Sequence, residues 1–103
     1  MIDTIKLPGD CETMVEVRAG VDQTDREIVA LLERRFGYMR AAARIKQDRA
    51  SVRDEARKAA VIRAAADQAA AGGLPREAIA DLWDRLVEAS IAYELTEWDR
   101  LRA

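Results

Sequence analysis

The chain has 103 residues, half of them apolar, and a formal net charge of −2 with acidic and basic residues interspersed. This length predicts one globular domain with a modest core, and the mixed charge gives no footprint for nucleic acid. The lack of histidine and the single cysteine exclude zinc sites and histidine-dependent nucleophilic catalysis. An enzyme with this composition would work with arginine, lysine, carboxylates and hydroxyls.

Nothing in the sequence predicts a membrane or an exported protein. No apolar run approaches the roughly 18 residues needed to span a bilayer. The first ten residues, MIDTIKLPGD, lack the basic and apolar blocks of a signal peptide. Cys11 cannot form an intrachain disulfide and is expected to be an inert thiol near a helix start. These features favour a cytoplasmic protein.

Two capping-box patterns mark the starts of the first two predicted helices. Thr13-Met14-Val15-Glu16 opens a helix of about 13–48, in which the threonine and the glutamate each satisfy a backbone N–H. Ser51-Val52-Arg53-Asp54 opens an alanine-rich helix of about 52–71.

Glycine and proline separate the second helix from the third. Gly72-Gly73 ends the second helix, and Pro75 stands where a first-turn proline belongs in a third helix of about 75–101. No strand alternation or internal repeat appears. The prediction is an all-α domain of three helices covering 1–103.

The first helix is too long for this chain to cover. Roughly 36 residues at 1.5 Å each make a rod of about 54 Å, whereas a compact chain of this length has a radius of gyration near 13 Å. Its apolar residues nevertheless form one stripe within a sector of roughly 80°: Met14, Val17, Val21, Ile28, Leu32, Met39 and Ala43. A stripe of this length predicts an intertwined homodimer with an isologous interface.

Two cations, Arg35 and Lys46, lie within this stripe, 11 residues or about 16 Å apart. A cation facing a core is costly unless an anion pairs with it. Either residue alone is explained by a side chain that extends to solvent or pairs with a carboxylate of the chain. Both on one stripe favour a site for an anionic ligand.

The third helix has polar residues in its apolar stripe too. Ile79, Trp83 and Leu86 define that stripe, and Ser90 and Glu94 lie on it one turn apart. A serine bonded to its own helix and an internal salt bridge of the glutamate are the ordinary explanations.

The second helix carries Asp54 and Arg57 at an i,i+3 spacing, which most often means a solvated surface pair. Taken with the polar residues of the other helices, this pair describes a cavity lined by several cations, one serine and one carboxylate. Such a cavity suits a small dianion whose carboxylates are held by guanidinium groups.

The sequence resembles the all-helical chorismate mutases, including their isochorismate-pyruvate lyase branch, over nearly its whole length. The segments that carry the resemblance are Asp10-Cys11, VRAGVDQTDREIVALLERRFGYMRAAARIK, VRDEAR and SIAYE. The long segment is the specific one, because it combines V-R-x-x-V-D, D-x-x-I-V-x-L-L-x-x-R and a lysine at fixed spacing. The resemblance implies an all-helical dimeric enzyme without metal or organic cofactor.

The resemblance also implies roles for residues. Arg18 matches an arginine that the partner subunit contributes, and Arg35 and Arg57 match arginines that hold the two substrate carboxylates. Lys46 matches the lysine at the ether oxygen whose bond breaks. Asp54 matches an acidic residue near the ring hydroxyl, and Ser90 matches a serine that helps to hold a carboxylate. Arg18 and Lys46 lie 28 residues apart, roughly 42 Å along one helix, so they share a site only across a dimer.

Two positions depart from the chorismate mutase pattern. Lys58 stands where many members have a glutamate that binds the ring hydroxyl, which resembles the lyase branch, as does the stretch 38–46. Glu94 stands where many have a glutamine beside the ether oxygen. Asp54 and Ser90 favour the mutase. We therefore expect a chorismate mutase, with isochorismate-pyruvate lyase as the alternative reaction.

The expected mechanism needs no nucleophile. Conversion of chorismate to prephenate requires that Arg18, Arg35 and Arg57 orient the substrate and that Lys46 and Glu94 stabilise charge on the ether oxygen. A carboxylate cannot donate a hydrogen bond, so only protonated Glu94 would assist there. A non-catalytic helical dimer that binds an aromatic-pathway metabolite, or whose buried charges only fix register, remains a further hypothesis.

Overall fold

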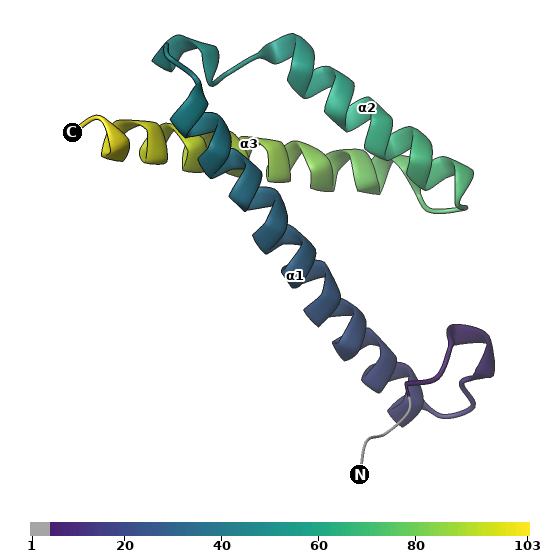
Figure 1. The fold of residues 1–103 in the computed structure, drawn as a ribbon. Helices are drawn as coiled ribbons and strands as arrows, with labels where there is room; N and C mark the ends of the chain where they lie inside the picture. The colour runs from purple at the N-terminus through teal and green to yellow at the C-terminus, as the bar shows by residue number, and fades with distance from the viewer. Residues whose placement is uncertain (1–4) are drawn as a thin grey trace. The chain divides into compact units, whose positions relative to one another are not determined.

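The computed structural model describes residues 5–103 and contains three long helices with no strand among those residues (Figure 1). The all-α prediction is confirmed. Residues 1–4, where the segment considered for a signal peptide begins, lie outside the described residues. The elements in chain order are η1 (Pro8–Asp10), α1 (Met14–Ile45), η2 (Arg49–Ser51), α2 (Glu55–Ala71) and α3 (Arg76–Leu101).

The predicted capping box starts α1. Thr13 Oγ1 accepts a hydrogen bond from the Glu16 backbone N–H at 3.2 Å, and Glu16 Oε1 accepts from the Thr13 N–H at 3.1 Å. Glu16 also pairs with Lys6, which lies just before the short turn η1. The hydrogen bond from Lys6 and those from the Glu12 and Thr13 N–H groups lower the pKa of Glu16 to about 2. The N-terminal segment is thereby fastened to the first turn of α1.

The connection from α1 to α2 is longer than the sequence suggested. Helix α1 ends at Ile45 instead of about 48, and α2 begins at Glu55 instead of about 52. The second capping box was therefore placed wrongly. Ser51 Oγ donates to the Asp48 carbonyl at 2.7 Å inside η2, and Asp54 is the N-cap of α2, accepting from the Arg57 N–H at 3.0 Å. An aspartate is as good an N-cap as a serine, and the extended backbone of Asp54 suits that position.

Gly72 and Gly73 end α2 as predicted, since Gly73 has a φ of +80° that side-chain-bearing residues rarely adopt. Pro75 is the N-cap of α3 and not a residue of its first turn, so the helix begins one residue later than predicted. Helices α2 and α3 then run alongside each other (Figure 1). The core at this end of the molecule consists of Val52, Val87 and Ile91, with Val61, Ile62, Leu95 and Trp98 packed against them.

The chain divides into two compact units, residues 1–36 and residues 37–103. In the described part of the first unit, the predicted apolar stripe of α1 stays open. Met14, Val21 and Ile28 expose 57%, 52% and 49% of their surface, which is far more than core residues of this type retain.

Within residues 5–103, no helix has an apolar stretch long enough to cross a membrane.

Candidate active site

Lys46 and Glu94 form an ion pair in the second unit, which is the internal salt bridge given above as the ordinary explanation of Glu94. The Nζ atom of Lys46 lies 2.8 Å from Oε2 of Glu94. The Glu94 side chain is 5% exposed, while that of Lys46 is 31% exposed. Oε2 makes no directed hydrogen bond among the described residues, so its contact with Lys46 is ionic. The pair therefore combines a buried carboxylate with an ammonium group that can still reach a ligand.

Helix α3 places Glu94 in apolar surroundings. Val87, Ser90, Ile91 and Glu94 are the buried residues of this helix and recur at helical spacing on one face. Ser90 Oγ donates to the Leu86 carbonyl at 2.7 Å, which is the ordinary role of a serine within a helix. Its hydroxyl proton is thus engaged in the ligand-free chain, and holding a carboxylate would require it to rotate.

Asp54 and Arg57 are neighbours at the start of α2, but they do not form the predicted side-chain pair. The Asp54 carboxylate caps the helix through the Arg57 backbone N–H. Both residues are exposed, and within residues 5–103 the Arg57 guanidinium group has no hydrogen bond or ion pair. The Arg57 side chain is therefore available to bind an anion.

Arg18 and Arg35 belong to the first unit, apart from the other predicted site residues. Arg18 is exposed, and its guanidinium group has no partner in the described part of the chain. Arg35 is half-buried and engaged in an interaction. The second unit thus brings together Lys46 and Glu94 and contains Asp54, Arg57 and Ser90.

Lys58 forms ion pairs with two acidic residues of α3. Its Nζ atom lies 2.7 Å from Glu88 Oε2 and 3.0 Å from Asp84 Oδ1, and Arg53 donates to both oxygens of Glu88 at 2.8 and 3.0 Å. Hydrogen bonds from Arg53 and then Lys58 lower the pKa of Glu88 to about 2. Lys58 therefore helps to fasten the start of α2 to α3.

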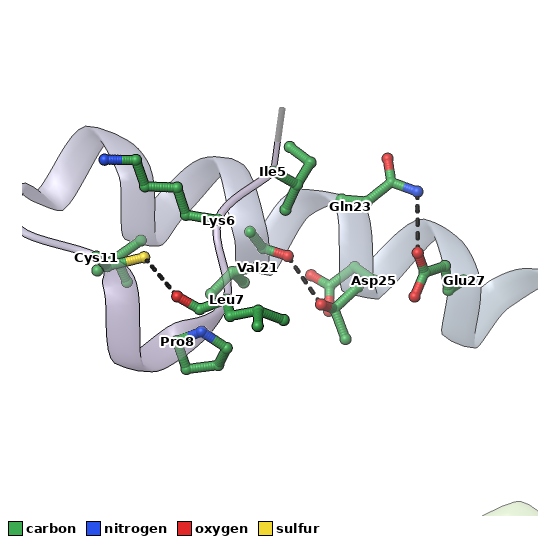
Figure 2. A pocket seen from close by; sticks show the side chains of 12 residues that line it. Ile5, Lys6, Leu7, Pro8, Cys11, Val21, Gln23, Asp25 and Glu27 are labelled. Atoms are coloured by element: carbon green, nitrogen blue, oxygen red, sulfur yellow. Dashed lines mark hydrogen bonds between the residues drawn. The ribbon is translucent and has the colours of Figure 1, made fainter. Parts of the chain in front are cut away.

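A pocket of about 660 Å³ lies in the first unit between the N-terminal segment and α1 (Figure 2). Ile5, Leu7, Pro8 and Val21 line it, and Cys11 Sγ donates to the Leu7 carbonyl at 3.6 Å. It contains none of the predicted site residues. Among residues 5–103, no cluster of acidic, histidine or cysteine side chains is arranged to hold a metal ion.

Comparisons with known proteins identify the family. Residues 17–95 match the family model for chorismate mutase type II. This range contains every predicted site residue and covers most of the chain. The chain belongs to the chorismate mutase type II family.

A curated relative extends the match beyond that range. An isochorismate pyruvate lyase from Pseudomonas aeruginosa is 31% identical over 98 residues, covering 95% of this chain and 97% of the lyase. The chain therefore belongs to an enzyme family, and the family model and this relative are named for two different reactions. Lys46 and Glu94, the two residues expected at the ether oxygen, form an ion pair in which only the carboxylate is buried.

Sequence reasoning missed a set of polar contacts around the end of α1. Arg40 Nη1 donates to the Tyr93 hydroxyl at 2.9 Å, and Trp98 Nε1 donates to the Lys46 carbonyl at 3.0 Å. Arg102 donates to the same carbonyl at 2.7 Å. These partners lie more than 50 residues apart in the sequence, so no local pattern predicts their pairing.

Proposed function

We propose that the protein is a chorismate mutase, which rearranges chorismate to prephenate within one molecule. The observation that carries this proposal is the Lys46–Glu94 pair at 2.8 Å, in a chain that belongs to the chorismate mutase type II family. In the rearrangement the ether C–O bond breaks as a new C–C bond forms. No nucleophile or obligatory proton transfer is required, in keeping with a site of arginine, lysine and carboxylate side chains.

In this proposal, arginine side chains bind the substrate. Arg35 and Arg57 would hold the two carboxylates, and Arg18 of the second subunit would complete the site. The exposed and unpartnered guanidinium groups of Arg18 and Arg57 within residues 5–103 support these roles. Asp54 would lie near the ring hydroxyl, and Ser90 would help with one carboxylate after its hydroxyl turns from the Leu86 carbonyl. Holding the side chain folded over the ring lowers the entropic part of the barrier.

The chemical step depends on charge. Negative charge builds on the ether oxygen in the transition state, and a fixed ammonium group there stabilises it more than the ground state. Lys46 would supply that group, and Glu94 would supply a second donor in its protonated form. The apolar neighbours of Glu94 on α3 strengthen such interactions, because they lower the local dielectric.

The active form is proposed to be a homodimer. The open apolar stripe of α1 supports this, since Met14, Val21 and Ile28 are about half exposed in the single chain. The separation of Arg18 and Lys46 by 28 positions, roughly 42 Å along a helix, also requires two chains for one site. Sedimentation should find a dimer whose unfolding depends on protein concentration.

Isochorismate-pyruvate lyase activity is the second candidate. The relative from Pseudomonas aeruginosa, similar over 95% of this chain, favours it. Lys58 favours it as well, because a lysine bound to Glu88 and Asp84 cannot replace a glutamate at the ring hydroxyl. The lyase reaction breaks the same ether bond and moves a hydrogen to the departing pyruvate.

Separate incubations with chorismate and with isochorismate test the proposal. We expect prephenate from chorismate at a rate that Lys46→Ala lowers by at least about 10²-fold, which excludes a contaminating enzyme. Salicylate and pyruvate from isochorismate, without prephenate from chorismate, would instead identify a lyase. If neither substrate is consumed by the dimer, the enzymatic assignment fails and a metabolite-binding role is left.

A further inference from the structure

One of the last carbonyls of α1 and the carbonyl that follows the helix accept hydrogen bonds from Trp98 and Arg102 at the end of α3. The final four carbonyls of any helix lack donors from their own helix. Here Arg102 donates through Nη1 to the Ala43 carbonyl at 3.1 Å and through Nη2 to the Lys46 carbonyl at 2.7 Å. Trp98 Nε1 donates to the same Lys46 carbonyl at 3.0 Å. Trp98 of α3 and Arg102, which directly follows α3, thus fix the backbone of the residue that follows α1.

The two donors also hold each other. The Arg102 guanidinium carbon lies 4.2 Å from the centre of the Trp98 ring, which is a cation–π contact, and Nη1 also donates to the Trp98 carbonyl at 3.3 Å. Farther along the loop, Arg49 binds both carboxylate oxygens of Asp99 at 2.8 and 3.1 Å. The contacts with Trp98 therefore orient the Arg102 guanidinium group for its hydrogen bonds to the end of α1.

Lys46 is consequently held at both ends by one helix. Its ammonium group pairs with Glu94, and its carbonyl accepts from Trp98, which lies four residues after Glu94 on α3. Helix ends fray readily, and a lysine one residue beyond a helix would otherwise move with that end. Catalysis by a fixed charge requires that this motion be suppressed.

We propose that Trp98 and Arg102 are positioning residues that fix the backbone of Lys46 for catalysis. This inference rests on the proposed function for the role of Lys46. It concerns two residues beyond 95, outside the range matched by the family model. Neither residue needs to touch the substrate, because each acts through the Lys46 carbonyl.

Three variants of the full-length protein test the proposal. Trp98→Phe keeps an aromatic ring for Arg102 but removes the N–H donor, and Arg102→Gln removes the paired donors and the cation. Arg100→Gln is the matched control, because Arg100 lies in the last turn of α3 and binds only Glu97 of its own helix among the described residues. Circular dichroism and sedimentation establish that each variant is folded and has the same oligomeric state as the parent protein.

The first readout does not depend on activity. Trypsin cleaves after lysine, so the fragment that ends at Lys46, followed by mass spectrometry, reports how often this backbone opens. Each lost hydrogen bond should raise the cleavage rate by about two- to tenfold in Trp98→Phe and Arg102→Gln. Arg100→Gln should be cleaved like the parent protein. Unchanged cleavage in both test variants would overturn the proposal whatever the enzyme does.

The second readout is the split between kcat and KM on chorismate. A displaced Lys46 weakens an interaction made mainly in the transition state, so kcat should fall by several-fold while KM stays within about twofold. Faster cleavage with an unchanged kcat would show a purely structural clamp and would overturn the positioning role. If the parent protein consumes neither substrate, the proposed function fails, and the cleavage rates still decide whether Trp98 and Arg102 hold the Lys46 backbone.

Discussion

At the scale of single residues, the decisive feature is the pairing of Lys46 with a carboxylate that is almost fully buried. An uncompensated buried charge is strongly unfavourable, so Glu94 needs a cation close by in the ligand-free chain. Lys46 meets that need at 2.8 Å while keeping 31% of its side chain exposed. One ammonium group therefore balances the Glu94 carboxylate and, in the proposed mechanism, would also stabilise charge on the ether oxygen.

Replacing Lys46 by alanine should lower kcat on chorismate by about 10²-fold or more, as the loss of a preorganised donor does elsewhere. The fold should persist at a lower free energy of unfolding, because the buried Glu94 carboxylate loses the cation that pairs with it. Steady-state kinetics and circular dichroism check both points. Arg44→Ala removes an exposed cation two residues earlier, in the last turn of α1, and should leave kcat unchanged. Turnover within twofold of the parent protein in Lys46→Ala would refute the site.

Replacing Glu94 by glutamine should largely preserve kcat on chorismate. Only a protonated carboxyl can donate to the ether oxygen, whereas a glutamine amide always carries donors. Glu97→Gln, three residues along α3, is the control for the loss of a carboxylate from this helix and should leave kcat unchanged. Steady-state kinetics measure both variants.

The ion pair with Lys46 defines the opposite result for that experiment. If Glu94 acts as an anion that anchors Lys46, the glutamine variant should lose most of its activity. A strongly lowered kcat in Glu94→Gln would therefore exclude the donor role.

At the scale of elements, the sequence predicted helices better than their junctions. The capping box Thr13–Glu16 and the stop at Gly72-Gly73 depend on neighbouring residues, so the local pattern was sufficient. The start of α2 was misplaced, because Val52 is drawn into the core with Val87 and Ile91 and leaves Asp54 to cap the helix. That competition between a local cap and distant packing cannot be read from residues 51–54 alone.

The sequence likewise indicated some features of the candidate site and missed others. Stripe positions singled out Lys46 and Glu94, since each interrupts an apolar face, but they did not identify the two residues as partners. They gave no indication that Trp98 and Arg102 bind the Lys46 carbonyl, because backbone acceptors carry no sequence signature. Arg18 belongs to the other unit and lies 28 positions before Lys46, so in the proposed site it comes from a second chain.

The cap of α2 gives a prediction at this scale. Asp54→Ala should lower the free energy of unfolding by about 1 kcal/mol, because the Arg57 N–H loses its acceptor. Asp54→Asn should stay close to the parent protein, since asparagine caps equally well. Denaturant unfolding at one protein concentration measures both. Equal stability of the alanine variant would show that the cap contributes nothing.

The contacts of Glu88 with Arg53 and Lys58, which join the start of α2 to α3, predict that the stability of the fold depends on pH. The pKa of Glu88 is lowered to about 2 from an ordinary 4.5. Because the pKa of Glu88 is lower in the folded state, its ionised carboxylate stabilises the protein at pH values above 4.5. That contribution is lost as pH falls through 4.5 toward about 2. Glu88→Gln should therefore lower Tm near neutral pH and lose less Tm on acidification than the parent protein.

The matched control for that measurement is Asp81→Asn, which removes one negative charge from an exposed position on the same helix. It should follow the parent protein across the acidic range. A Glu88→Gln variant with the parent's full acid sensitivity would show that the contacts with Arg53 and Lys58 are not a source of pH-dependent stability.

At the scale of the whole molecule, the proposed site is complete only in a dimer. Helix α1 has 32 residues, and the apolar side chains of its first half stay open in a single chain. A second copy would cover them and bring its Arg18 to the site that contains Lys46. Burial of the stripe and completion of the site would then be one event, so loss of the dimer should abolish activity.

Mixing two inactive variants tests this account most directly. Arg18→Ala and Lys46→Ala, each nearly inactive as a homodimer, are unfolded together and refolded at equal concentration. Half of the dimers should then be mixed, each with one intact site of two, so about a quarter of the parent chorismate mutase activity should return. Mixed dimers that form, as native mass spectrometry would show, yet remain inactive would contradict a site shared between the two chains.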